Sequence, residues 1–144
     1  MLALTDALGF RRDAARSMPA GLRHVVAAVA ALHAVAHLVG AVDAVDAIDR
    51  GTGVSYLGGW LEVTDPSALR VAGIAWAVAA ALYGVAAIAV WMGLAAWPRV
   101  LLAASVVSAG MCVLGLWGAV LGIPVSLALA ALAIAGIRSG RRHA

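Results

Sequence analysis

Two histidines one helical turn apart lie in the middle of a long apolar stretch, residues 24–40, which reads HVVAAVAALHAVAHLVG. Residues four positions apart share one face of a helix, so the rings of His33 and His37 are expected to point into the same space. Imidazole forms hydrogen bonds, titrates near neutral pH and ligates transition metals. This pair is therefore the place in the chain where chemistry is expected.

Several kinds of chemistry stay open for this pair. The histidines could form purely structural hydrogen bonds between helices, or they could relay protons. They could also be the polar anchor of a pocket for an apolar or lipid-like ligand, because a polar group in lipid usually faces the protein interior or a cavity. The expected ligand-binding residues are His33, His37, Tyr83, Ser105, Ser108 and Trp76.

A haem or transition-metal site at His33 and His37 is a further alternative, and it would make the protein a redox carrier or an enzyme. Two histidines at this spacing can hold one transition ion. His24 lies near the end of this segment and about half a turn away in angle from His33, and the apolar segments contain no other His, Asp or Glu as a third ligand. A haem held by histidines of two helices would need a homodimer, because only this segment carries them.

The elements that position the histidines follow from composition. Of 144 residues, 65% are hydrophobic and 12% charged, whereas soluble domains have about 45–50% apolar and about 25% charged residues. The excess is gathered in runs long enough to cross a bilayer as helices. We therefore predict an all-α polytopic membrane protein, a bundle of four transmembrane helices.

The segment boundaries follow from the apolar runs and the polar residues between them. The prediction of the fourth span has the least support, because residues 124–137 would reach only about 21 Å as a helix. Within a transmembrane domain at 21–138, the predicted spans are about 22–42, 71–92, 99–117 and 123–137. An outer loop at 43–67 is expected, with an N-terminal cytoplasmic segment at 1–20 and a basic cytoplasmic tail at 139–144.

The arginines indicate the orientation, because basic residues accumulate in cytoplasmic loops. With four spans, all but two of the ten basic residues lie on one side, and only Arg50 and Arg70 lie on the other. Both termini are thus expected in the cytoplasm, and the protein in the cytoplasmic (inner) membrane. The arginines flank apolar blocks and form no basic stripe with aromatics, which argues against nucleic-acid binding.

Small and polar residues recur at helical spacing in three spans, and such faces pack helices together in lipid. A compact bundle is expected, with the protein also self-associating or serving as a partner membrane subunit. The faces predicted to turn inward are Ala30, His33, His37 and Gly40; Gly73, Ala77, Ala81 and Gly84; and Ser105, Ser108, Cys112 and Gly115.

Three other sets of residues have side chains capable of chemistry, and each is a weaker candidate than the histidine pair. The acidic residues at 43, 46, 49, 62 and 65 could gather a hard cation, but their spacing matches no EF-hand and favours a solvated loop. Cys112 is the single cysteine, which argues against disulfides and cysteine-based clusters within one chain. A Ser108–histidine–Asp43 triad is disfavoured because Asp43 projects away from His33.

Several short patterns occur in order along the chain: HAVAHLVG, SYLGGW, GIAW, the region of Ser105 and Ser108, and GIPVSLALA. Over roughly residues 32–130 the chain resembles a group of small bacterial four-helix integral membrane proteins with an HxxxH motif in the first transmembrane helix. The resemblance implies the four-helix architecture and the importance of His33 and His37, and it implies no particular activity.

Overall fold

The computed structural model describes residues 18–115 and 119–141, and within them it is a four-helix bundle. The helices are α2 (Ala20–Arg50), α3 (Pro66–Met92), α4 (Trp97–Leu114) and α6 (Gly122–Arg141). Each is long and apolar enough to cross a membrane. The predicted all-α class and four-span architecture are confirmed.

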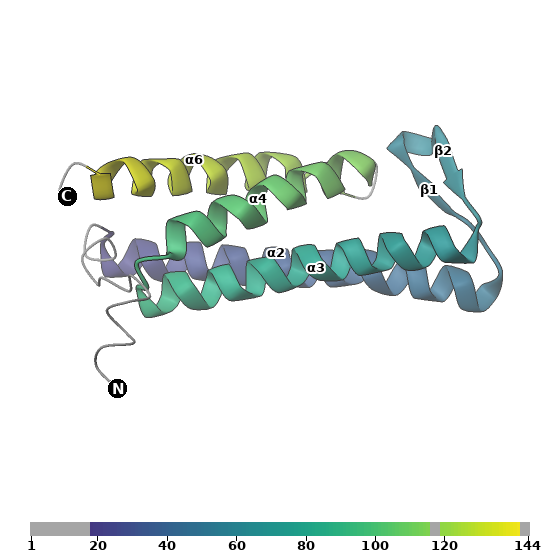
Figure 1. The fold of residues 1–144 in the computed structure, drawn as a ribbon, viewed down its shortest axis with the longest axis horizontal. Helices are drawn as coiled ribbons and strands as arrows, with labels where there is room; N and C mark the ends of the chain where they lie inside the picture. Colours follow the sequence, from purple (N-terminus) through teal and green to yellow (C-terminus); the bar gives the residue numbers. More distant parts are fainter. Residues whose placement is uncertain (1–17, 116–118, 142–144) are drawn as a thin grey trace.

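The helices form two antiparallel pairs, α2 with α3 and α4 with α6, and α3 packs against α4 (Figure 1). The first turns of α2 and the last turns of α6 lie at the same end of the bundle. Many apolar side chains outside this core are exposed, such as Leu32 (71%) and Val71 (68%). Apolar side chains on the outside of such a bundle suit a lipid surrounding.

Helix α2 continues past the predicted end of its span to Arg50. Its 31 residues reach about 46 Å, longer than a hydrocarbon core of about 30 Å. The additional turns are polar, and Arg50 pairs with Asp46 at 3.5 Å. The helix ends at Gly51, whose φ of 64° is accessible to glycine at little cost. The last turns therefore extend beyond the apolar part of the bundle.

A short β-hairpin connects α2 to α3, in the segment expected to be a loop. Strands β1 (Val54–Tyr56) and β2 (Leu61–Val63) pair antiparallel through the 3₁₀ turn η2 (Leu57–Gly59). Strands of three residues contain too few alternating positions to be recognised in a sequence. Just after this turn, Trp60 is 92% exposed.

The other helix boundaries also differ from the expected ones. Helix α3 begins at Pro66, before the predicted 71, because Asp65 caps it by accepting a hydrogen bond from the Ala68 N–H at 2.8 Å. Helix α6 has 20 residues and reaches about 30 Å, so it is long enough to span. Residues 1–17 and 142–144, which hold most of the expected N-terminal segment and part of the tail, lie outside the described residues.

The inward faces predicted for the first and third spans are found, whereas the face predicted for the second span is wrong except for Gly73, which is buried. Ala77 and Ala81 of α3 are exposed, and the buried face carries Trp76 and Tyr83 instead. The reason is that large aromatic side chains gain most from burial, while small residues on the other helices make room for them.

Candidate binding site around two buried histidines

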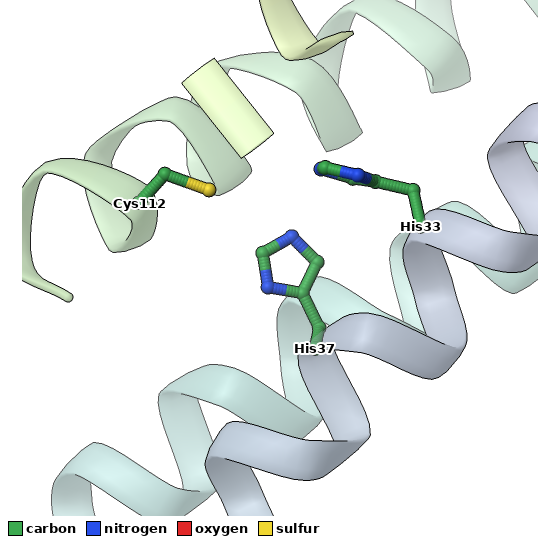
Figure 2. A group of neighbouring side chains, drawn as sticks. All are labelled: His33, His37 and Cys112. Carbon is green, nitrogen blue, oxygen red and sulfur yellow. The ribbon is translucent and has the colours of Figure 1, made fainter. Parts of the chain in front are cut away.

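Helix α2 turns both histidines into the interior of the bundle (Figure 2). His33 is 8% exposed and His37 is 2% exposed. Their ring centroids are 4.8 Å apart in an edge-on arrangement, as expected for side chains one helical turn apart. The ring of Tyr83 on α3 packs against both, 4.6 Å from His33 and 5.9 Å from His37. A haem shared between two copies would instead need histidines on an outer face.

One hydroxyl on α4 contacts both imidazoles. The Oγ of Ser108 lies 2.9 Å from His33 Nε2 and 2.7 Å from His37 Nε2. A serine hydroxyl has one hydrogen to donate and two lone pairs to accept with. It can donate to only one of the two rings, so where both contacts are hydrogen bonds, the other neutral ring donates its Nε2–H to Ser108. In that arrangement the two histidines do not both carry their proton on Nδ1.

The hydrogen-bond network continues from Ser108 across α3, α4 and α6. Ser126 Oγ lies 2.9 Å from Ser108 Oγ and 3.2 Å from His33 Nε2. The Tyr83 hydroxyl lies within donating distance of Ser126 (3.4 Å) and Ser105 (3.3 Å), and Ser105 donates to the Leu101 carbonyl at 2.8 Å. All four helices thus contribute to one buried polar network, which satisfies groups that would be costly in lipid.

Cys112 lies one turn after Ser108 on α4 and faces the histidines. Its Sγ is 3.9 Å from Ser108 Oγ, and one ligand atom from each of His33, His37 and Cys112 lies within 4.8 Å of the others. Cys112 was predicted on the inward stripe of the third span, but as the single cysteine it was not predicted to be a ligand. Its position on the same stripe as Ser105 and Ser108 was the signal that could have placed it at the site.

Trp76 fills the space beside the histidines on the side toward the hairpin. A Cβ at Gly40 would lie 2.7 Å from its Cδ2, and a Cβ at Gly115 would lie 3.0 Å from its Cζ2. The indole is therefore held between two helix backbones that come close only because both positions are glycine. Its ring centroid is 5.1 Å from that of His37.

A cavity of about 520 Å³ opens beside these side chains. Along α2 it extends from His33 to Asp43, which is about 15 Å at the helical rise per residue. Strand β1 of the hairpin borders the end near Asp43. Its lining is mostly apolar. The lining residues are His33, Ala36, His37, Val39, Gly40, Asp43, Val54, Ser55, Tyr56, Trp76, Cys112, Gly115, Ala119, Val120, Leu121, Gly122 and Val125.

One polar atom of the site is left without a partner. The Nδ1 of His37 is buried and makes no hydrogen bond to any residue among 18–115 and 119–141. An unpaired buried polar atom costs about 1–3 kcal/mol. Whichever tautomer His37 adopts, this nitrogen can hydrogen-bond a molecule that enters the cavity, either as a donor or as an acceptor.

The six predicted ligand-binding residues divide into two groups. His33, His37 and Trp76 line the cavity, while Tyr83, Ser105 and Ser108 lie behind the histidines in the hydrogen-bond network. That they bind a ligand stays a prediction. Ser126 was not predicted at the site, although it is the one hydroxyl residue between Gly122 and Ile137. Tyr56 was not predicted either, because the hairpin that brings this residue to the cavity was not foreseen.

The outer acidic residues do not gather into a cation site. Within the described parts of the chain, the one group of three or more His, Cys, Asp or Glu residues close enough to share a metal ion is His33, His37 and Cys112. Asp46 pairs with Arg50, and Asp43 lies at the outer end of the cavity. These positions agree with a solvated acidic segment.

Comparisons with known proteins do not indicate a function, so the function is inferred from the chemistry of this site. The chain matches no protein-family model, and the searches of curated proteins and of solved structures found no match either.

Proposed function

We propose that this protein is a membrane binding protein whose four-helix bundle holds an amphipathic small molecule in the cavity beside His33 and His37. The observation that carries the proposal is the buried, unpartnered Nδ1 of His37 at a cavity of about 520 Å³. Small-molecule sites are typically apolar clefts of about 300–1,000 Å³ with a few convergent polar groups. The cavity fits this description in both size and lining.

The charges of the lining favour an uncharged ligand. Among the described residues, the lining contains one acidic side chain, Asp43, and no arginine. A phosphate or carboxylate headgroup would meet no positive partner there and would be repelled by Asp43. A hydroxyl, carbonyl or amide group would instead pair with His37 Nδ1 inside the bundle. The proposed ligand is therefore a neutral amphiphile with a hydrogen-bonding group on an apolar body.

The cavity opens toward the lipid on one side, where the apolar body of such a ligand could extend. Val120 and Leu121 line the cavity and are 53% and 79% exposed. Both lie between α4 and α6, at the hairpin end of the bundle. We infer that the ligand enters from the bilayer at this point, with its polar group directed toward His37.

The orientation of the protein is part of this proposal. Arg23, Arg99 and Arg138 lie at the end of the bundle opposite the hairpin. Asp43, Asp46 and Asp49 lie in the last turns of α2, at the hairpin end. By the positive-inside rule, this distribution supports cytoplasmic termini and a cavity mouth on the outer side of the cytoplasmic membrane. The resemblance to small bacterial HxxxH membrane proteins stays a prediction, as does self-association or a partner subunit.

Native mass spectrometry of the protein released from mild detergent tests the proposal. We expect the wild-type protein to retain an organic molecule. Ala119→Trp, which fills the cavity, should lose it, as should His37→Leu, which removes Nδ1. Ala28→Trp is the matched control, because Ala28 lines a separate shallow groove between α2 and α3. A bare wild-type protein, or an equal added mass in Ala119→Trp, would refute the proposal.

A further inference from the structure

The deepest part of the site brings together three side chains that ligate soft metal ions. His33, His37 and Cys112 are all buried, and one ligand atom from each lies within 4.8 Å of the others. Figure 2 shows the sulfur of Cys112 directed toward the two imidazole rings, from the opposite side of the interior. Two imidazoles and a thiol are donors typical of transition-metal sites.

The first residue of α6, Gly122, lies close to this cluster. A Cβ at Gly122 would lie 2.5 Å from Cys112 Sγ and 3.4 Å from His33 Cε1. Position 122 therefore accommodates the sulfur beside His33 only because it lacks a side chain. A second observation is that His33, His37 and Cys112 all line the cavity of about 520 Å³, through which a ligand can reach them.

The Ser108 hydroxyl now occupies the space between the donors, with both Nε2 atoms within 2.9 Å and Sγ at 3.9 Å. In a three-coordinate site, metal bonds of about 2.0–2.3 Å would hold a nitrogen and a sulfur about 3.8 Å apart. The three side chains must therefore draw together by up to about 1 Å, and Ser108 must rotate aside or supply its oxygen.

We propose that His33, His37 and Cys112 form a binding site for one Cu(I) ion within the membrane. Thiolate and imidazole are both good ligands for this soft ion. Charge selects it over Zn²⁺ in this position. When Cu⁺ replaces the thiol proton of Cys112, which leaves to water through the cavity, the complex of one cation, one thiolate and two neutral imidazoles has no net charge.

A Zn²⁺ ion in the same three ligands would leave one uncompensated positive charge inside the bundle, which is costly. The one acidic side chain in the described cavity lining, Asp43, follows His37 by six residues, about 9 Å along α2. It is too distant to act as a ligand. The donor set and the charge thus point to the same monovalent ion.

The test is a Cu(I) titration of metal-free protein in detergent under reducing conditions, against a competing chromophoric chelator. The wild-type chain should bind one Cu(I), and X-ray absorption should detect one sulfur and two nitrogen neighbours. Loss of an outer-shell partner alone costs about 10–100-fold in metal affinity, so Cys112→Ser and His37→Gln should each weaken binding at least about 100-fold. His24→Gln, a histidine outside the cluster, is the matched control.

Any of three results would overturn the proposal: no Cu(I) retained by the wild type, unchanged binding in Cys112→Ser, or a first coordination shell without sulfur. Displacement of Cu(I) by an equal concentration of Zn²⁺ would overturn the assignment of the ion. The inference does not rest on the proposed organic ligand. Ala119→Trp should lose that ligand and still bind Cu(I), so the two proposals can fail separately.

Discussion

The indole of Trp76 lies against the backbone of Gly40, so closely that a Cβ at position 40 would be 2.7 Å from the ring. This contact joins α2 to α3 beside His37 and sets one wall of the cavity. Gly40→Ala should therefore destabilise the protein by about 1–3 kcal/mol, the usual range for overpacking, as measured by denaturant unfolding in micelles.

Gly84→Ala is the control for this contact, because a Cβ at position 84 would have nothing within 4 Å. Alanine is favoured over glycine in helices by up to about 1 kcal/mol. The control should be neutral or stabilised, and an equal loss in both variants would show that the Trp76 contact is not the cause.

Removal of the Ser108 hydroxyl should weaken the bundle. In Ser108→Ala, His37 Nε2 loses its 2.7 Å partner and Ser126 loses one of its contacts. Single hydrogen bonds in membranes contribute about 0.6 kcal/mol on average, and buried groups left unpaired cost more. We expect a loss of about 1–3 kcal/mol in unfolding free energy. Ser139→Ala, near the end of α6, should change it by less than about 0.5 kcal/mol.

The shared contact with Ser108 also fixes the protonation pattern of the histidines. If Ser108 is hydrogen-bonded to both rings, at least one neutral ring carries its hydrogen on Nε2, because Ser108 has a single proton to donate. Nitrogen-15 NMR of imidazole-labelled protein distinguishes the two tautomers. Finding both His33 and His37 as Nδ1–H tautomers would show that Ser108 donates to only one ring and that Ser126 is the donor to His33.

Cysteine labelling in intact cells tests the orientation. Thr52→Cys, beside the hairpin, should react with a membrane-impermeant reagent added outside, and Ser139→Cys should be protected. The wild-type protein is the blank, because Cys112 is 1% exposed. The opposite pattern would reverse the proposed topology, and labelling of both positions would mean that α6 does not cross the membrane.

Tyr56 of the hairpin should make the folded protein less stable at alkaline pH. Burial raises the pKa of the Tyr56 phenol above its ordinary value, and the charge of Asp43 raises it further. The folded state therefore favours the neutral phenol, and this contribution is complete below about pH 10 and is lost as the pH rises through the raised pKa. Thermal unfolding between pH 8 and 11 should show a smaller alkaline decline in Tyr56→Phe, and an identical decline would exclude Tyr56 as its source.

The sequence could predict the features that depend on long-range composition and helical spacing. Four apolar runs predict four helices, and the four-residue spacing of His33 and His37 predicts their common direction. Ser108 was foreseen because it stands at the depth of His33 on a recognisable polar stripe. These inferences need only the geometry of single helices.

Features that depend on how helices meet could not be predicted in this way. The approach of Cys112 to the histidines requires the register of α4 against α2, and Gly122 takes part only because α6 passes close to the sulfur. The face of α3 was misjudged because a stripe of small residues was preferred over Trp76 and Tyr83. The close contact of Gly40 on α2 and of Gly115 after α4 with the ring of Trp76 favours the observed packing instead.

The buried network also has a consequence for how the chain is made. Among the residues that the structure describes, the hydroxyl partners of His33 on α2 are Ser108 and Ser126, which lie 75 and 93 residues later in the chain. When α2 and α3 first leave the insertion machinery as a pair, both imidazoles lack these partners, and exposing them to lipid is unfavourable. The first helix pair should therefore stay beside the insertion machinery until α4 and α6 arrive, so that biogenesis has a built-in order and a truncated chain is marked for degradation.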